Sequence, residues 1–330
     1  MKTAVYSYST DNLGDEVQSI ATKRLLPRVD TLIERDRLIL SPNEPIFLIA
    51  NGWHLHSNDF PPPPQVTPFY IAFHAANNLA LTPPILAHLK AHGPIGCRDM
   101  FTLQRLKAHG IPAYWSSCLT TTLEARGTGS RKDVLLVDVD PDLLDSIPEP
   151  IAKFATTLTQ HSGSTITPLR HEARILKIIH DRKFPATSIS DRLYRAFVAH
   201  RQSHFLPKTL VHDRFQRAEH LLSRYEMAKL VITSRLHCAL PCVAMGTPVV
   251  FLHNNPQDPR MGAVDRYLKV YSGCDSHEID WAPEAIQGKQ LNLHKAFLRE
   301  AVRTAVECQA NPFQNYKASD LNEITSSLLG

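Results

Sequence analysis

The sequence of 330 residues has no long apolar run and no strong excess of charge of one sign. No window approaches the ~20 apolar residues of a membrane-spanning helix, so we expect no integral membrane segment. The 36 Lys and Arg residues exceed the 32 Asp and Glu residues by only four. Without a dense Lys/Arg run, this charge does not favour a nucleic-acid partner. Acidic residues at Asp11, Asp15 and Glu16 come too early for a signal peptide, and we expect none.

Cysteine is also sparse, and its spacing excludes two kinds of site. The six cysteines form no CxxC pair and no tight framework of the kind that stabilises small secreted domains. We therefore predict a reduced, cytoplasmic protein without a zinc site. No dense group of Asp, Asn, His or Glu stands out as a ligand set for another metal. We expect neither a metal nor a cofactor.

What is present points to two α/β domains. Hydrophobic residues make up 43% of the chain and charged residues 21%, which is typical of globular proteins. At roughly 100–200 residues per domain, the length suggests two domains. A polar stretch around Gly127 and Gly129 interrupts the pattern. We predict an N-terminal domain of residues 1–128 and a C-terminal domain of residues 129–330, whose last helix packs back on the first domain.

Short apolar runs alternate with amphipathic segments in both halves. We predict strands at residues 4–9, 46–50, 70–73, 94–97, 111–115, 134–139, 156–159, 230–233 and 248–252. We predict helices at residues 14–26, 84–91, 99–108, 171–180, 214–228, 238–245 and 297–306. This alternation favours two Rossmann-like domains with mostly parallel sheets. Ligands bind beyond the carboxyl ends of such strands, and two domains facing each other would form a cleft.

The most informative segment is residues 230–251, which predicts a strand, a turn, a helix and a second strand. Proline is tolerated only in the first turn of a helix, so Pro241 places the start of that helix near Cys238. Arg235 and His237 then lie on the turn, beside free N–H groups and the positive end of the helix dipole. A guanidinium and an imidazole there suit a small acid with several negative charges. Equally, Arg235 could pair with a core carboxylate and His237 could be a satisfied turn residue.

A second candidate segment is the turn between the first strand and the first helix. Gly14 permits a tight turn or a close backbone approach, and Asn12 lies beside it. Asp15 is placed to accept a hydroxyl proton or to bind a sugar. Acidic residues also stabilise a helix amino terminus by ~0.3–1 kcal/mol, and we favour this structural role for Glu16. For Asp99 we favour the related role of capping its helix.

Three segments together resemble the polysaccharide pyruvyl transferase family. They are Asp11-Asn12-Leu13-Gly14-Asp15-Glu16, Gly93-Pro94-Ile95-Gly96-Cys97-Arg98-Asp99, and Ser234-Arg235-Leu236-His237 with the alanine-bearing helix and Met245-Gly246-Thr247-Pro248-Val249-Val250 after it. The resemblance extends from the first strand to about Arg260. It implies a two-domain fold like the glycosyltransferase B type and a role in polysaccharide or exopolysaccharide biosynthesis. The implied reaction moves a pyruvyl group from phosphoenolpyruvate to two hydroxyls of a saccharide, free or lipid-linked, and forms a cyclic ketal.

The resemblance also assigns roles to individual residues. It places Arg235, His237 and Arg98 at the phosphoenolpyruvate site. We expect the two arginines to hold the anionic groups, and His237 to contact the phosphate or to act as the acid. Asp15 is the other candidate catalytic residue. The remaining candidate substrate-binding residues are Asn12, Gly14, Asn51, Gly52, Ser234 and Arg260.

Two departures from the family pattern concern the sugar side. The second strand of the family ends in a glycine-rich turn, and here Asn51 and Gly52 would serve that purpose. Trp53 and His54 then shape a sugar pocket or pack in the core. Residues 116–120 lack the aspartate that many members carry at that point, which could alter the acceptor.

Two other functions stay open on the sequence alone. A glycosyltransferase that uses a nucleotide sugar could have the same architecture, because fold does not fix function. Its donor would need a carboxylate in the second domain to hold the ribose, where this chain has Met245 and Gly246. A non-catalytic glycan-binding homologue would bind sugar and release no phosphate.

Overall fold

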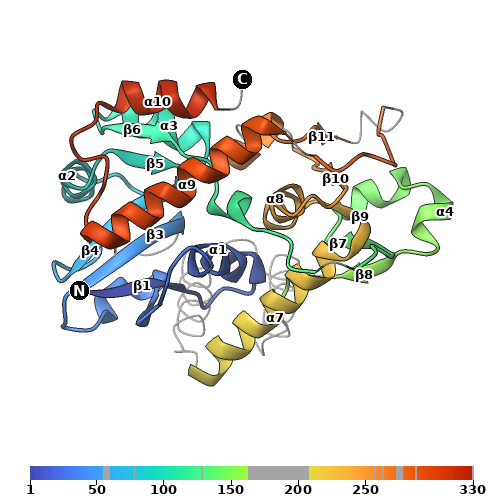
Figure 1. Ribbon diagram of the computed structural model, residues 1–330, viewed down its shortest axis with the longest axis horizontal. Coiled ribbons are helices and arrows are strands. Elements are labelled where there is room, and N and C mark those ends of the chain that lie inside the picture. Colours follow the sequence, from blue (N-terminus) through green and yellow to red (C-terminus); the bar gives the residue numbers. More distant parts are fainter. Residues whose placement is uncertain are drawn as a thin grey trace, which may run out of the picture.

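Two parallel β-sheets stand side by side in the computed structural model, with helices packed on both (Figure 1). The structure describes residues 1–54, 60–77, 79–127, 129–162, 208–255, 258–261, 264–272, 278–286 and 288–328. The strands of the first sheet end at residue 115 and those of the second begin at residue 133, so the predicted α/β class with two parallel sheets is confirmed. The helix predicted at residues 171–180 lies outside the described residues, as does Cys274.

The first sheet has six strands in the order β2-β1-β3-β4-β5-β6, and all neighbours are parallel. Its strands are β1 (Lys2–Ser7), β2 (Thr31–Glu34), β3 (Ile46–His54), β4 (Val66–Ala75), β5 (Ile95–Cys97) and β6 (Ala113–Trp115). Its helices are α1 (Leu13–Lys23), α2 (Pro83–Ala91) and α3 (Met100–Ala108). Helix α1 packs on β1 and β3, and α3 packs on β4, β5 and β6. The long strands β3 and β4 are buried along nearly their whole length, as expected for strands covered on both faces.

The second sheet has five strands in the order β11-β10-β9-β7-β8, again all parallel. Its strands are β7 (Asp133–Val137), β8 (Thr156–Leu158), β9 (Ala228–Thr233), β10 (Val249–Leu252) and β11 (Val270–Tyr271). Its helices are α4 (Glu149–Ala152), α7 (Lys208–Glu226) and α8 (Leu236–Ala244). Helices α7 and α8 contact α1, so these three helices join the two halves of the molecule.

The C-terminal end of the described chain returns to the first sheet through α9 (Lys289–Cys308) and α10 (Ala318–Ser327). Helix α10 lies along β6, the strand at the edge of that sheet (Figure 1). The Asn322 side chain accepts a hydrogen bond from the Trp115 backbone N–H (3.1 Å) and donates one to the Ala113 carbonyl (3.0 Å). It therefore satisfies backbone groups that the edge strand leaves without a neighbouring strand. Across the described chain, no helix combines the length and apolar character needed to cross a bilayer.

Two predictions about the first sheet are wrong. The strand predicted to stop at residue 50 continues to His54, because a bulge at Asn51 and Gly52 keeps the chain paired with β4. The predicted turn at Asn51 and Gly52 is therefore a point inside a strand, where the φ angle of Gly52 is +150°. Strand β2 was not predicted, since only Ile33 of its four residues is buried and no apolar run marks it.

Two boundaries in the second half also differ. The helix predicted to reach residue 228 ends at Glu226, because Ala228 already pairs with Asp133 of β7. Helix α8 begins at Leu236 and contains Pro241 beyond its first turn. Proline lacks the N–H that the His237 carbonyl would accept, and that carbonyl accepts a hydrogen bond from Gln160 Nε2 (3.0 Å) instead.

Candidate active site

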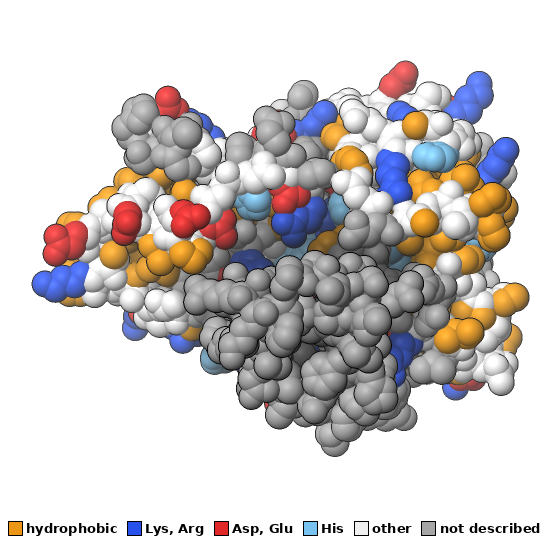
Figure 2. Space-filling model, turned by 180° about the vertical axis from the view of Figure 1, so that it is seen from behind, with side chains coloured by type: hydrophobic (Ala, Val, Ile, Leu, Met, Phe, Trp, Pro, Cys, Tyr) orange, Lys and Arg blue, Asp and Glu red, His pale blue; other side chains and the backbone are white. Residues whose placement is uncertain are grey.

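Side chains from both halves meet at the carboxyl ends of the strands in what we call the cationic cluster: His74, Arg98, His237 and Arg260. His74 lies near the end of β4, Arg98 directly follows β5, His237 lies in the first turn of α8, and Arg260 lies in the 3₁₀ turn Pro259–Met261. Basic, acidic and His side chains gather near the middle of the face shown in Figure 2, between the two halves. The cluster thus combines residues that are far apart in the sequence.

His237 is a buried member of the cluster. Burial, followed by the positive charges of Arg98 and Arg260, holds the pKa of His237 well below its usual value. A protonated His74 would lower it further. The Nε2 atom of His237 is buried and has no hydrogen-bond partner among the described residues. An imidazole in this state is ready to bind an anion that reaches Nε2.

Arg98 is also buried, with only 6% of its surface exposed. Its Nε lies 3.6 Å from Asp99 Oδ2, too far for a hydrogen bond, and no partner for this Nε stands within the described part of the chain. The Asp99 oxygens are already engaged, since Oδ1 accepts from the Thr102 backbone N–H (2.8 Å) and Oδ2 contacts His74 Nδ1 (2.5 Å). The expected cap role of Asp99 is thus seen, together with a bond to His74 that the sequence did not predict. Arg98 is left with donor capacity for a ligand.

Arg260 forms the outer wall of the cluster. Its guanidinium pairs with Asp258 (2.5 Å) and lies 5.8 Å from the centre of the Trp53 ring. A cavity of about 10 Å³ lies between Arg98 and Arg260, bounded also by Ser117 and Tyr267. This volume holds about one water molecule. This cavity leaves no room for a larger ligand between Arg98 and Arg260.

Arg235 points away from the cationic cluster. Its Nε pairs with Asp138 Oδ2 (3.2 Å) and its Nη2 contacts His161 Nε2 (2.8 Å). His161 Nδ1 in turn contacts Asp11 Oδ2 (3.1 Å), so this chain of contacts joins the second half to the first. Of the two interpretations left open by the sequence, the pairing with a carboxylate is the one this conformation contains. Ser234 Oγ accepts a hydrogen bond from the Asp140 backbone N–H (2.9 Å) and has a structural role here.

Asp15 lies in a separate buried network. It accepts hydrogen bonds from Thr10 Oγ1 (2.7 Å) and Gln18 Nε2 (3.3 Å), and it lies 3.7 Å from Arg35 Nη1. Arg35 also makes two hydrogen bonds to Asp36 and lies over the Tyr8 ring. Among the described contacts, none brings the Asp15 carboxylate to the cationic cluster.

The remaining candidates of the first half build its framework. Asn12 caps α1 by accepting from the Gly14 backbone N–H (3.0 Å). A Cβ at Gly14 would lie 3.2 Å from the Cβ of His237, so the glycine allows α8 to approach α1 closely. Asn51 donates to the Gln18 carbonyl and Gly52 lies against the Tyr8 hydroxyl, so neither faces the cluster.

Two features of the region were not predicted from the sequence. His74 follows the buried run of β4 directly, and a polar residue at the carboxyl end of a parallel strand is a signal that could have identified it. Glu16 lies in the first turn of α1 as predicted, but it is also buried and makes two hydrogen bonds to Arg214 of α7 (2.7 and 2.9 Å), which the sequence did not predict. Burial raises the pKa of Glu16 to about 7 against the opposing charge of Arg214. This ion pair joins the two halves on the side of α1.

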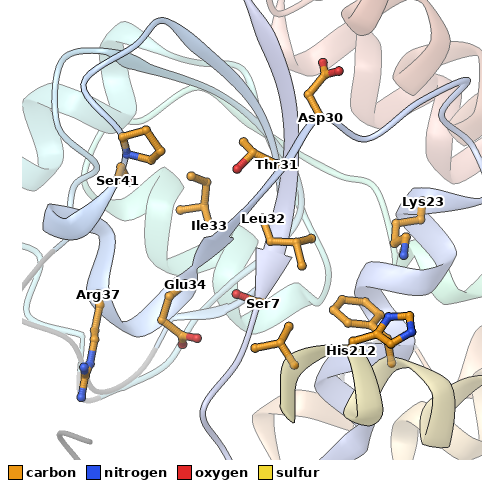
Figure 3. A pocket seen from close by; sticks show the side chains of 13 residues that line it. Ser7, Lys23, Asp30, Thr31, Leu32, Ile33, Glu34, Arg37, Ser41 and His212 are labelled. Carbon is orange, nitrogen blue, oxygen red and sulfur yellow. The ribbon is translucent and has the colours of Figure 1, made fainter. Parts of the chain in front are cut away.

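A much larger cavity of about 510 Å³ lies between the edge strand β2 and the start of α7. Lys23, Glu34, Arg37 and His212 line it (Figure 3). None of its lining residues belongs to the cationic cluster. Volume alone would thus select a different site from the one that the buried nitrogens indicate. No three His, Cys, Asp or Glu side chains of the described ranges lie together in a way that could hold a metal ion.

Comparison with known proteins identifies the family. The family model of polysaccharide pyruvyl transferases matches residues 12–256, about three quarters of the chain. No curated protein matches. A solved structure from Klebsiella pneumoniae subsp. pneumoniae NTUH-K2044, the functionally uncharacterised protein KP1_0663, shares 14% identity with a TM-score of 0.41, and the match covers 82% of this chain and 92% of that one. Because the family model matches well over half of the chain, over a range that contains Arg98 and His237, the chain belongs to the polysaccharide pyruvyl transferase family.

Proposed function

We propose that the protein transfers a pyruvyl group from phosphoenolpyruvate to two hydroxyls of a saccharide and forms a cyclic ketal. The observation that carries this proposal is the pair of unpartnered nitrogens, Arg98 Nε and His237 Nε2, inside the cationic cluster. A buried polar group without a partner costs about 1–3 kcal/mol. A small molecule with a carboxylate and a phosphate would satisfy both nitrogens, and membership in the family supports this donor.

The arginines have different roles in this proposal. In this proposal Arg98 and Arg260, which both line one small cavity, hold the two anionic groups of the donor. Arg235 is held by Asp138 and His161, and it fixes the turn that presents His237. This differs from the sequence resemblance, which assigned Arg235 together with Arg98 to the binding of phosphoenolpyruvate.

His237 supplies the acid. Burial and the charges of Arg98 and Arg260 hold its pKa low, and the negative charge of a bound phosphate would raise it. A protonated His237 can then give its proton to the methylene carbon of the donor while a hydroxyl oxygen attacks the adjacent carbon. Positive charge that develops on that carbon faces the donor carboxylate, and the phosphate leaves.

Donor binding requires the cluster to open. A phosphate ester of three carbons is far larger than a cavity of about 10 Å³. The turn that carries Arg260 or the two halves themselves must move apart to admit it. We further propose that residues 1–128 and 129–330 are the two domains of a fold like the glycosyltransferase B type, with the acceptor on the first domain and the cleft between them.

Thermal unfolding with phosphoenolpyruvate and with nucleotide sugars tests the donor. Phosphoenolpyruvate at 100 times its dissociation constant should stabilise the protein by about 2.7 kcal/mol. Arg98→Met should remove this effect and leave the melting temperature without ligand nearly unchanged. Stabilisation by nucleotide sugars alone would instead support a glycosyltransferase. Phosphate release with saccharide mixtures separates an enzyme from a glycan-binding protein, which would release none.

A further inference from the structure

We propose that His74, held by Asp99, is the catalytic base that takes the proton from the attacking saccharide hydroxyl. This inference rests on the proposed function and adds a residue that neither the motifs nor the family match assigns. It concerns the acceptor half of the reaction, whereas Arg98, His237 and Arg260 concern the donor half. The argument starts from the contacts of the two His74 ring nitrogens.

The first observation is that one nitrogen of His74 is fixed. Its Nδ1 lies 2.5 Å from Asp99 Oδ2, and the Thr102 hydroxyl lies 3.3 Å from the same nitrogen. Asp99 is itself held by the Thr102 backbone N–H, so the carboxylate cannot turn away. A carboxylate at Nδ1 keeps the proton on that nitrogen and leaves the lone pair on Nε2. The imidazole is therefore presented as a base in one orientation.

The second observation is that the protonation states suit this role. Burial, followed by the charge of Arg98, lowers the pKa of His74, while the bond to Asp99 opposes this shift. Burial would raise the pKa of Asp99, but the hydrogen bond from His74 and the charge of Arg98 lower it below its usual value. At neutral pH, Asp99 is then ionised and His74 is neutral.

The third observation is that His74 has the Trp53 ring as a neighbour and also lies near Arg98 and Arg260. The Trp53 ring lies edge-on to the His74 ring with 6.1 Å between their centres. Arg98 and Arg260 are among the charges that shift both His74 and His237. A sugar that stacks near Trp53 would thus lie between a base from the first half and an acid from the second.

The proposed step balances without a further reactant. His74 Nε2 takes the hydroxyl proton as the oxygen bonds to the second carbon of phosphoenolpyruvate, and His237 gives its proton to the methylene carbon. The electron pair of the carbon–oxygen bond leaves with the phosphate, and the second hydroxyl then bonds to the same carbon. Two hydroxyl protons are released in total. One of them balances the proton that His237 gave to the methylene carbon, so that His237 is protonated again. The other ends on the departing phosphate.

The decisive variant is His74→Asn, because the Asn amide can still donate to Asp99 but has no basic nitrogen. We expect turnover to fall by about 10²–10⁴-fold, the usual contribution of a general base. Phosphate release is measured with phosphoenolpyruvate and a panel of p-nitrophenyl hexosides as probe acceptors. The apparent affinity for phosphoenolpyruvate, measured by thermal stabilisation, should stay within about twofold of the wild-type value. The matched control is His88→Asn, which removes a partly buried imidazole that contacts the Tyr70 hydroxyl in the same half.

Two further measurements distinguish a base from a structural residue. Imidazole in solution should restore part of the turnover of His74→Gly. The acidic limb of the kcat profile should move to lower pH in Asp99→Asn, because Asp99 raises the pKa of His74. The charged and titratable groups that interact with His74 across the packed elements are His54, Arg98, Asp99, His237 and Arg260.

The outcomes separate this inference from the proposed function. Loss of turnover with donor binding retained and with imidazole rescue supports His74 as the base. Turnover within about threefold of the wild type in His74→Asn overturns it, as does loss of donor binding together with turnover, which would make His74 a donor ligand. If the wild-type protein shows neither stabilisation by phosphoenolpyruvate nor phosphate release, the proposed function fails and this inference fails with it.

Discussion

Two buried arginines at the carboxyl end of the first sheet have opposite surroundings. Arg35 follows β2 and lies between the carboxylates of Asp15 and Asp36, with the Tyr8 ring beside it. Arg98 follows β5 and has one carboxylate nearby, whose oxygens are already bonded to Thr102 and His74. Burial alone therefore does not tell a structural arginine from a binding one. The difference is that two carboxylates flank Arg35, whereas the oxygens of the carboxylate beside Arg98 are bonded to other groups.

Replacing each arginine with methionine should give the largest difference in the free energy of unfolding. Arg35→Met leaves Asp15 and Asp36 without their cation, and loss of one partner of a buried pair costs about 3–5 kcal/mol. Arg98→Met should cost much less stability and remove the stabilisation by phosphoenolpyruvate. Urea unfolding with and without the donor measures both. A stability loss from Arg98→Met as large as that from Arg35→Met would show that both arginines are structural.

The imidazole of His237 gives the next largest effect. His237→Gln should lower turnover by about 10²–10⁴-fold, because the variant has no proton to give to the methylene carbon. The free energy of unfolding should change by less than about 1 kcal/mol, since Nε2 has no partner to lose among the described residues. Calorimetric titration with the donor in buffers of different ionisation enthalpy should show proton uptake by the wild type that is smaller in His237→Gln. Equal uptake in the two proteins would remove His237 from the role of acid.

His54 is a buried imidazole outside the cationic cluster, and its Nε2, like that of His237, has no partner among the described residues. It packs against the rings of Phe60 and Phe73, and burial, aided by Arg35, lowers its pKa to about 3. The unfolded chain therefore binds a proton at His54 below pH 6.5 that the folded protein does not, and stability falls as the pH drops from 6.5 toward 3. His54→Phe should reduce this loss by about 2 kcal/mol between pH 7 and pH 5. Urea unfolding at the two pH values tests it, and an unchanged pH dependence would contradict it.

The smallest expected effect is at Gly14, where α1 meets α8. A Cβ there would lie 3.0 Å from Asn12 Oδ1 and 3.2 Å from the Cβ of His237. Gly14→Ala should cost about 1–3 kcal/mol of stability through overpacking, and turnover should fall because His237 is displaced. Thermal unfolding and phosphate release measure the two effects. Gly288→Ala is the control for the loss of a glycine, because the nearest atom to a Cβ at Gly288, Gln290 Oε1, lies at 3.9 Å and the φ angle of Gly288 is not positive.

Most of the strands and helices follow from local pattern, because buried parallel strands are continuous apolar runs. The exceptions have identifiable causes. Strand β2 is a half-exposed edge strand without an apolar run, and the extension of β3 to His54 depends on pairing with β4 across a bulge. Neither cause is visible in a window of a few residues. Pairing with a distant strand decided both boundaries.

The candidate site was predictable in part. The turn before α8 and the residue after β5 carry motifs, so the sequence predicted Arg98 and His237 as candidates, and the structure brings them into one cluster. His74 was not found, since no local pattern connects it to Asp99 across 24 intervening residues. Arg235 stands in the strongest motif, yet Asp138 and His161 reach it only because β7, β8 and β9 are neighbours.

The sequence by itself determined the parallel α/β class, the family and the identity of the residues at the strand ends, because hydrophobic period and short motifs are local properties. Only the tertiary structure decided which of those polar groups have partners. Charge and hydrogen bonding depend on distances between segments that are remote in the chain. That is why Arg35, Arg214 and Arg235 make hydrogen bonds to carboxylates of the protein, whereas Arg98 Nε lies 3.6 Å from its nearest carboxylate and His237 Nε2 has no partner among the described residues.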